Sequence, residues 1–216
     1  RAWSPTPNDT DTFYDVSLTQ NATVSFNKGG DDYSIRTAVN YLEQNGVVPN
    51  SKKEQTRISL NAKYNVSEKL EFYTNINYES RSFLNNPDQG YGNLGSNFNQ
   101  WWQRQLDFKR LRNFEQQGNL VSWNINSPRS TKPLYWDMPA LHSYENLKHD
   151  YKNAVFGKIG ANYTINDNIK LTAEVRRTFN SYATDDRGTT KSLLAQSFYF
   201  ESMQRTSQKE FFAMAS

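Results

Sequence analysis

The sequence contains no cysteine, which excludes disulfides, thiolate zinc sites, iron–sulfur clusters and cysteine nucleophiles for this chain. It also lacks any apolar run of roughly 18 residues, the length that a transmembrane helix needs. Its basic residues form no run longer than pairs such as Lys52-Lys53 and Arg176-Arg177, and the formal net charge is only +3. This charge pattern indicates no nucleic-acid partner.

Aromatic residues are abundant in a chain that is otherwise polar. The 216 residues include 13 Tyr, 13 Phe and 5 Trp, which together make up 14% of the sequence. Disordered segments are poor in aromatic residues, because these side chains bury surface well. The chain is therefore predicted to fold, and its length fits one or two domains.

Apolar and polar residues alternate with period two in six segments. These are residues 17–27, 33–41, 57–64, 70–79, 155–164 and 169–176. Successive side chains of a strand point to opposite faces of a sheet, so each segment predicts a strand with one apolar and one polar face. Gly29-Gly30 and Asn166-Asp167-Asn168 are typical turn sequences, and they predict antiparallel hairpins between neighbouring segments.

A soluble β-sandwich and a transmembrane β-barrel share this period, so strand length and aromatic placement must separate them. The segments have about ten residues, the length of a tilted membrane crossing, whereas strands in globular sheets usually have about five or six. Aromatic residues stand near the ends of the apolar parity, as the interfacial girdles of a barrel require. They are Phe26, Tyr33, Tyr41, Tyr64, Tyr78 and Tyr163. These features favour an antiparallel transmembrane β-barrel over a soluble sandwich or jelly roll.

Short and long connections alternate along the chain. Residues 28–31, 65–69 and 166–168 are short, whereas residues 46–54, residues 82–150 and the segment after residue 183 are longer. Outer-membrane barrels combine short periplasmic turns with longer extracellular loops. The longer segments are therefore predicted to lie outside the cell.

The longest connection, residues 82–150, loses the alternation and is rich in tryptophan. Residues 99–114 fit a short helix that is capped by Asn97 or Asn99 and apolar on one side. Its other side carries four basic residues, Arg104, Lys109, Arg110 and Arg112. One interpretation is a helix packed on the rim or plug of a barrel. The other is a surface for ligand stacking or partner contact, because Trp and Arg anchor interfaces and stack on planar groups.

Two further patterns in this connection have a simple interpretation. Gly90-Tyr-Gly92-Asn-Leu-Gly95 matches the GxGxxG pattern of dinucleotide-binding folds, but those folds need buried parallel strands, so a Gly/Asn loop is favoured. His142 and His149 are the only histidines, and no carboxylate cluster accompanies them at ligand spacing. They are interpreted as ordinary loop residues. We expect no metal, no cofactor and no enzymatic activity.

Three motifs in the first strands carry a resemblance to a known family. The run Asn21-Ala-Thr-Val-Ser-Phe26-Asn-Lys-Gly-Gly30-Asp-Asp-Tyr33-Ser-Ile-Arg36 is followed by Tyr41-Leu-Glu-Gln-Asn-Gly46-Val-Val-Pro49-Asn50-Ser. In order and spacing they resemble the early barrel of SusC/RagA-type TonB-dependent transporters. Trp101-Trp102-Gln-Arg-Gln-Leu106-Asp107 and the hairpin at residues 163–171 are similar to that family too. Asn27-Lys28 departs from the Ser that the family usually has before the Gly pair.

The resemblance implies a 22-stranded outer-membrane barrel of a Gram-negative bacterium, with an N-terminal plug and a TonB box. It also implies two partners, the TonB complex and a SusD-like surface lipoprotein that delivers glycans or peptides. About seven or eight strands are readable in this sequence, without plug or TonB box, which are too few to close such a barrel. Residues 1–216 are therefore expected to be part of the barrel domain of a longer protein, with residues 82–150 as an extracellular loop.

The predicted barrel assigns roles to two sets of residues. The polar parity would line a hydrated lumen through Arg36, Arg57, Lys63, Glu71, Asn75, Glu79, Lys158, Glu174 and Arg176, most of which are expected to satisfy one another. Candidates for substrate binding or contact with the lipoprotein are Trp101, Trp102, Arg104, Trp123 and Trp136. Outer-membrane lipids would contact the apolar parity. The alternative prediction is a soluble β-sandwich carbohydrate-binding module that stacks sugars on the Trp-rich loop.

Overall fold

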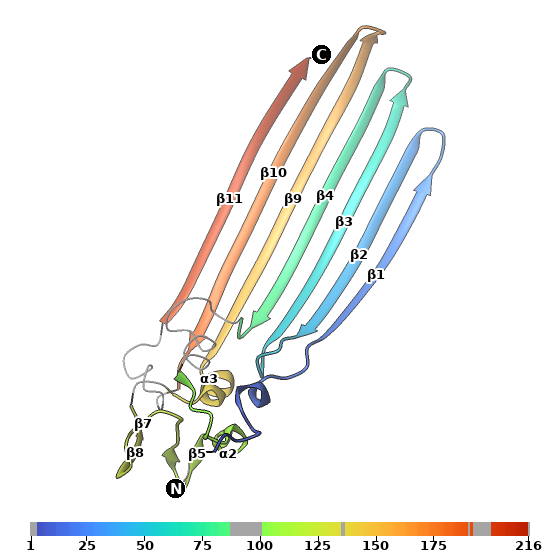
Figure 1. Cartoon of the computed structure of the whole chain (residues 1–216). Helices are drawn as coiled ribbons and strands as arrows, with labels where there is room; N and C mark the ends of the chain where they lie inside the picture. The colour runs from blue at the N-terminus through green and yellow to red at the C-terminus, as the bar shows by residue number, and fades with distance from the viewer. Residues whose placement is uncertain (1–3, 87–100, 135–136, 190, 192–199, 216) are drawn as a thin grey trace.

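The computed structural model of the chain describes residues 4–86, 101–134, 137–189, 191 and 200–215. Within them, seven long strands form one sheet in which all neighbours are antiparallel, so the predicted antiparallel all-β fold is confirmed (Figure 1). In sheet order the strands are β1 (Leu18–Gly29), β2 (Tyr33–Asn45), β3 (Lys52–Ser67), β4 (Leu70–Leu84), β9 (Leu147–Asn166), β10 (Ile169–Arg187) and β11 (Phe200–Ala215). The sheet is open, with β1 and β11 at its edges.

The strands are longer than the alternating segments predict. β9 has 20 residues and β10 has 19, because polar residues beyond the alternation continue the hydrogen-bonded ladder as far as the pair Leu147 and Arg187. β3 and β4 extend in the same direction, as far as the pair Lys52 and Leu84. The connection predicted at residues 82–150 is therefore shorter and spans residues 85–146.

The pairing register places the apolar parities of six strands side by side, and we call the surface that they form the apolar face. Its large side chains include Val24, Val39, Ile58, Ile76, Ile159 and Val175. Val24 is 76% exposed and Ile159 is 62% exposed. The other two sheets in the described part of the chain are short two-stranded hairpins, which leaves this face uncovered there.

The two ends of the sheet differ, as the connection lengths predict. The tight turns between β1 and β2, between β3 and β4 and between β9 and β10 lie at one end, and the connections from β2 to β3 and from β4 to β9 lie at the other (Figure 1). The 3-10 helix η1 (Thr10–Phe13) before β1 also lies at this second end.

The connection between β4 and β9 contains secondary structure of its own. It includes α2 (Phe108–Leu111), β5 (Glu115–Gln116), β6 (Asn119–Leu120), β7 (Ile125–Ser127), β8 (Ser130–Pro133) and α3 (Pro139–Glu145). β5 pairs with β6, and β7 pairs with β8, each as a small antiparallel hairpin. In the described part of the chain, no helix is long and apolar enough to cross a membrane.

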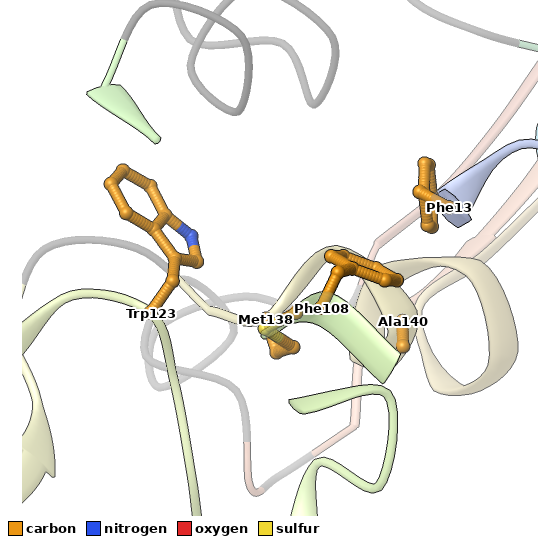
Figure 2. Close-up of a cluster of buried hydrophobic side chains, with 5 residues drawn as sticks. All are labelled: Phe13, Phe108, Trp123, Met138 and Ala140. Atoms are coloured by element: carbon orange, nitrogen blue, oxygen red, sulfur yellow. The ribbon is translucent and has the colours of Figure 1, made fainter. Parts of the chain in front are cut away.

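This connection and η1 share a hydrophobic core, which we call the loop core. It comprises Phe13, Phe108, Trp123, Met138 and Ala140 (Figure 2). Phe13 and Phe108 pack edge to face with ring centroids 5.3 Å apart. All the buried hydrophobic residues found among the described residues lie here or at the adjacent Leu141, and the sheet contributes none.

The helix predicted at residues 99–114 is largely wrong where the structure describes it. Of residues 101–114, Trp101 and Phe108–Leu111 are α-helical, whereas residues 102–107 are not. Asp107 is the N-cap of α2, and its carboxylate accepts a hydrogen bond from the backbone N–H of Arg110 at 3.3 Å. The helix starts late because Asp favours the cap position and because Asn8 also donates its side-chain amide to Asp107 at 3.0 Å. The predicted caps Asn97 and Asn99 lie outside the described residues.

The two sides predicted for this segment are nevertheless largely present without a continuous helix. The apolar residues Trp102, Leu106, Leu111 and Phe114 pack against the loop core, whereas Trp101, which was expected on the same side, is exposed. The basic residues Arg104, Lys109, Arg110 and Arg112 are exposed. Most apolar side chains of this segment therefore face the loop core and its basic side chains face solvent, although the backbone turns at Gln103–Leu106 instead of continuing as a helix.

Two asparagines attach the loop core to the end of the sheet. The Asn50 side chain, in the connection after β2, donates to the Ser143 carbonyl of α3 at 2.8 Å. The Asn85 side chain, just after β4, donates to the same carbonyl at 2.9 Å and accepts from the backbone N–H of Lys148 at 3.0 Å. Both residues have positive φ, 58° and 49°, which Asn tolerates better than most residues.

Candidate functional site

The nine residues predicted to line a lumen share one face of the sheet, which we call the polar face. The register joins them across β2, β3, β4, β9 and β10, and each lies on the parity opposite to the apolar face. They are Arg36, Arg57, Lys63, Glu71, Asn75, Glu79, Lys158, Glu174 and Arg176. The strands therefore bring together charged residues that lie up to 140 positions apart in the sequence.

Glu174 is the most buried of these charged groups, with 8% of its surface exposed. Tyr73 donates its hydroxyl to Oε2 of Glu174 at 2.7 Å, and Lys158 Nζ lies 3.3 Å from the same oxygen. Arg176 forms an ion pair with Oε1 through Nε. One carboxylate thus receives a hydrogen bond and two cations from three strands, an arrangement that offsets the cost of burying its charge.

Gly160 makes this arrangement possible. It faces Tyr73 on one side and Glu174 on the other in the strand register. A Cβ at Gly160 would overlap the Tyr73 ring, so only glycine lets that ring lie across β9 to reach Glu174. Lys158 Nζ also lies 5.4 Å from the centroid of the same ring, within the range of a cation–π interaction.

The other carboxylates of the polar face that were predicted to line a lumen are paired as well. Glu71 forms an ion pair with Lys63 and accepts a hydrogen bond from Asn162 at 2.9 Å. Glu79 lies 3.1 Å from Arg57 Nε and 3.8 Å from Lys152 Nζ. These pairs agree with the expectation that most of these residues satisfy one another.

Arg36 differs from the other predicted lumen residues. Its side chain is exposed, and it has no ion-pair partner among the residues that the structure describes. It lines an open depression over β1 to β3, together with Asn27, Ser34, Asn61 and Lys63.

The Trp-rich candidates separate into exposed and packed residues. Trp101 is 59% exposed, whereas Trp123 is 7% exposed in the loop core. Trp102 packs 5.6 Å from Phe108 and 6.5 Å from Trp123, centroid to centroid. Trp123 and Trp102 therefore stabilise the connection and present little surface for ligand stacking.

The remaining candidates of that set are Arg104 and Trp136. Arg104 is exposed and pairs with Asp9 at 2.9 Å, which links the connection to the segment before β1. Trp136 lies outside the described residues, as does the GxGxxG segment at residues 90–95. Trp101 and Arg104 are thus the candidates that the structure describes as accessible.

The two histidines have different surroundings. His149 lies in β9 and not in a loop as predicted, and its ring contacts the hydroxyls of Ser82 and Tyr151, each at 2.7 Å. His142 lies in α3 with its Nε2 3.9 Å from the buried Asp137 carboxylate. Among the described residues no three His, Cys, Asp or Glu side chains gather closely enough to hold a metal ion.

The sequence matches none of the protein-family models with which it was compared, and no curated protein matches it either.

Sequence reasoning missed Tyr73 and Gly160. The type of each residue at its position in the strand was informative, but the search for alternation did not consider it. Tyr73 is an aromatic residue on the polar parity, and Gly160 is a glycine inside a strand, a position that often marks close approach of another group. Only the register shows that the two residues are neighbours.

We predict that Gly160→Ala lowers the free energy of unfolding by about 1–3 kcal/mol. The new methyl group would displace the Tyr73 ring and remove its hydrogen bond to Glu174. Gly157→Ala is the matched control on the same strand, because the nearest atom to its Cβ is Ile76 Cγ1 at 3.8 Å, an ordinary contact. Denaturant unfolding of both variants measures the difference. Equal stability of the two variants would show that the Tyr73 contact contributes nothing.

We predict that acid destabilises the loop core through His142. Burial lowers the pKa of His142 below its ordinary value, although the Asp137 carboxylate opposes this shift. Protonation is therefore easier in the unfolded state, and stability is lost as the pH falls from about 6.5 towards the lower folded pKa.

Fluorescence of the packed tryptophans during denaturation at pH 8 and at pH 5 measures this loss. His142→Gln should flatten the dependence, and the same pH dependence in that variant would assign it to another group.

Proposed function

We propose that this chain forms part of the wall of an outer-membrane β-barrel that imports nutrients, of the SusC/RagA-type TonB-dependent kind. The barrel would import oligosaccharides or peptides, would be driven by the TonB complex, and would receive its substrate from a SusD-like surface lipoprotein. In this proposal the apolar face contacts lipid, the polar face lines a hydrated lumen, and the connection between β4 and β9 lies outside the cell.

The observation that carries the proposal is the uncovered apolar face. Monomeric soluble proteins rarely expose apolar patches larger than a few hundred Å². Here large apolar side chains of six neighbouring strands stand exposed on one face, while most charges of these strands, with exceptions such as Arg177, gather on the other. Apolar-out and polar-in alternation is typical of transmembrane barrels.

The dimensions of the apolar face support the same function. The apolar parity of β4 runs over residues 70–78, nine residues in all, and a tilted crossing needs about nine to eleven. Tyr64 lies between Tyr33 and Phe72 in the register near the tight turns, and Tyr41 and Tyr78 stand towards the other end. Two aromatic borders of this kind are typical of the interfacial girdles of barrels.

Membrane fractionation together with gel migration distinguishes a transport barrel from a soluble β-sandwich. Cells that express the whole protein containing this chain are fractionated, washed in alkaline carbonate and compared on denaturing gels with and without boiling. We expect retention in the outer membrane and heat-modifiable migration, because closed barrels resist detergent unfolding. Release as a soluble protein without heat-modifiable migration would refute the proposal.

Spin labels test the two faces directly. The chain has no cysteine, so Ile76→Cys and Asn77→Cys each add a single labelling position on adjacent residues of opposite parity. The label at position 76 should collide with oxygen dissolved in lipid, and the label at position 77 with a water-soluble nickel chelate. In a soluble sandwich position 76 would be buried and would meet neither agent.

A pair of adjacent tryptophans tests the extracellular assignment. Trp101→Ala should weaken uptake or lipoprotein binding without changing stability, because the side chain is exposed. Trp102→Ala should instead destabilise the loop core by about 3 kcal/mol, because it removes a ring packed on Phe108 and Trp123. Uptake assays, lipoprotein pull-down and tryptophan fluorescence measure these effects. Unchanged uptake and lipoprotein binding in Trp101→Ala would remove this residue from the proposed site.

A further inference from the structure

Between β1 and β10, one row of the polar face combines cations and amides, and it meets its first carboxylate residue at Glu210 of β11, which faces Arg176 in the register. Starting at β1, each member faces the next across neighbouring strands. The row consists of Asn27, Arg36, Asn61, Asn75, Lys158 and Arg176. Amide groups both donate and accept hydrogen bonds, as sugar hydroxyls do, and guanidinium and ammonium groups pair with carboxylate or sulfate.

Arg36 is the cation of this row that has no carboxylate partner in the described part of the chain. Lys158 and Arg176 both pair with the Glu174 carboxylate, and Arg176 also faces Glu210 of β11 in the register. Glu71 and Glu79, which lie two rows away on either side, are held by Lys63 and Arg57. The positive charge that is open to a ligand therefore lies at Arg36.

Arg36 also lies where a ligand could reach it. The open depression over β1 to β3 is lined by Arg36 together with Asn27, Asn61 and other residues of these strands. The Asn75 amide donates to Asn61, so the amide groups form a connected set beside the guanidinium.

An aromatic ring stands next to the row. Phe156 belongs to the polar parity of β9, two residues before Lys158, and is 41% exposed. Its ring and that of Tyr73, which lies 5.4 Å from Lys158 Nζ, are aromatic groups on a face that is otherwise mostly polar. An exposed ring beside a few placed polar groups suits a sugar, whose ring has apolar faces and polar edges.

We propose, on the premise that the sheet is the wall of a transport barrel, that this row binds an oligosaccharide carrying carboxylate or sulfate groups. Arg36 pairs with an acidic group of the ligand, the Asn side chains bond its hydroxyls, and the Phe156 ring packs on a sugar face. The proposal narrows the substrate of the barrel to anionic glycans.

Binding to the purified, membrane-extracted protein tests this assignment with three probes: trigalacturonate, neutral galactotriose of the same length, and triglutamate. At low salt trigalacturonate should bind at least about tenfold more tightly than either of the others. Arg36→Gln should weaken trigalacturonate binding about tenfold, the usual effect of losing a charged hydrogen bond, and leave galactotriose unchanged. Arg177→Gln removes the same charge from the opposite face and should change neither affinity beyond about twofold.

The other outcomes overturn the assignment. Equal binding of the charged and neutral sugars, binding of neither, or an Arg36→Gln effect no larger than that of Arg177→Gln would exclude an anionic-glycan row. Preference for triglutamate would assign the row to peptides instead. Heat-modifiable migration of the same preparation shows which proposal has failed. Its loss refutes the barrel itself. Its presence without preferential binding of trigalacturonate refutes only the anionic-glycan assignment.

Discussion

The strand register is the constraint on which the rest of the structure depends. Side chains alternate between faces with a period of two, so a slip of one residue would move every apolar side chain of a strand to the polar face. Two irregularities lie at tight turns, at Asn65 and Ser67 before β4 and at Ile169 and Lys170 in β10. Both lie at the turn end of their strands, so the apolar side chains of the following ladder stay in phase.

The charge network on the polar face is a product of the same register. Tyr73, Gly160 and Glu174 come from three strands and meet only because β9 pairs with β4 on one side and with β10 on the other. Burying a carboxylate is costly without partners, and here the partners arrive from both neighbouring strands. Correct pairing therefore gives the Glu174 carboxylate its hydrogen bond and ion pairs, whereas a shifted pairing would leave Glu174 buried without these partners.

Much of this arrangement could be predicted from the sequence, and the limits are physical. Alternation gave the strands and their faces, and the Gly29-Gly30 turn gave the first hairpin. Strand ends could not be predicted, because the residues beyond the alternation, such as Lys148 and Asp186, are polar and pair through their backbones. The helix at residues 99–114 failed for a related reason. Its apolar spacing was satisfied by packing on a core formed with Phe13, which lies almost a hundred residues away.

Site prediction had the same limits. Alternation predicted that the nine polar residues share one face, which the register confirms. Their partners depend on which strands are neighbours, and β9 follows β4 only after a connection of about sixty residues. For the tryptophans, the sequence could not show which side chains are exposed. A run such as Trp101-Trp102 gives no sign of which ring faces the solvent, because in an irregular connection neither period two nor period 3.6 applies.

The sheet and the loop core differ in what stabilises them. The loop core buries Phe13, Phe108 and Trp123 among its own residues, so its side chains supply its hydrophobic stabilisation. Among its described side chains the sheet buries no large apolar one, so its apolar face would need a partner to gain the same stabilisation. In the proposed barrel a lipid bilayer would be that partner for every strand at once, whereas a protein partner would have to match each row of side chains separately. On that proposal the chain folds in two environments, with the loop core in water and the sheet in an apolar medium.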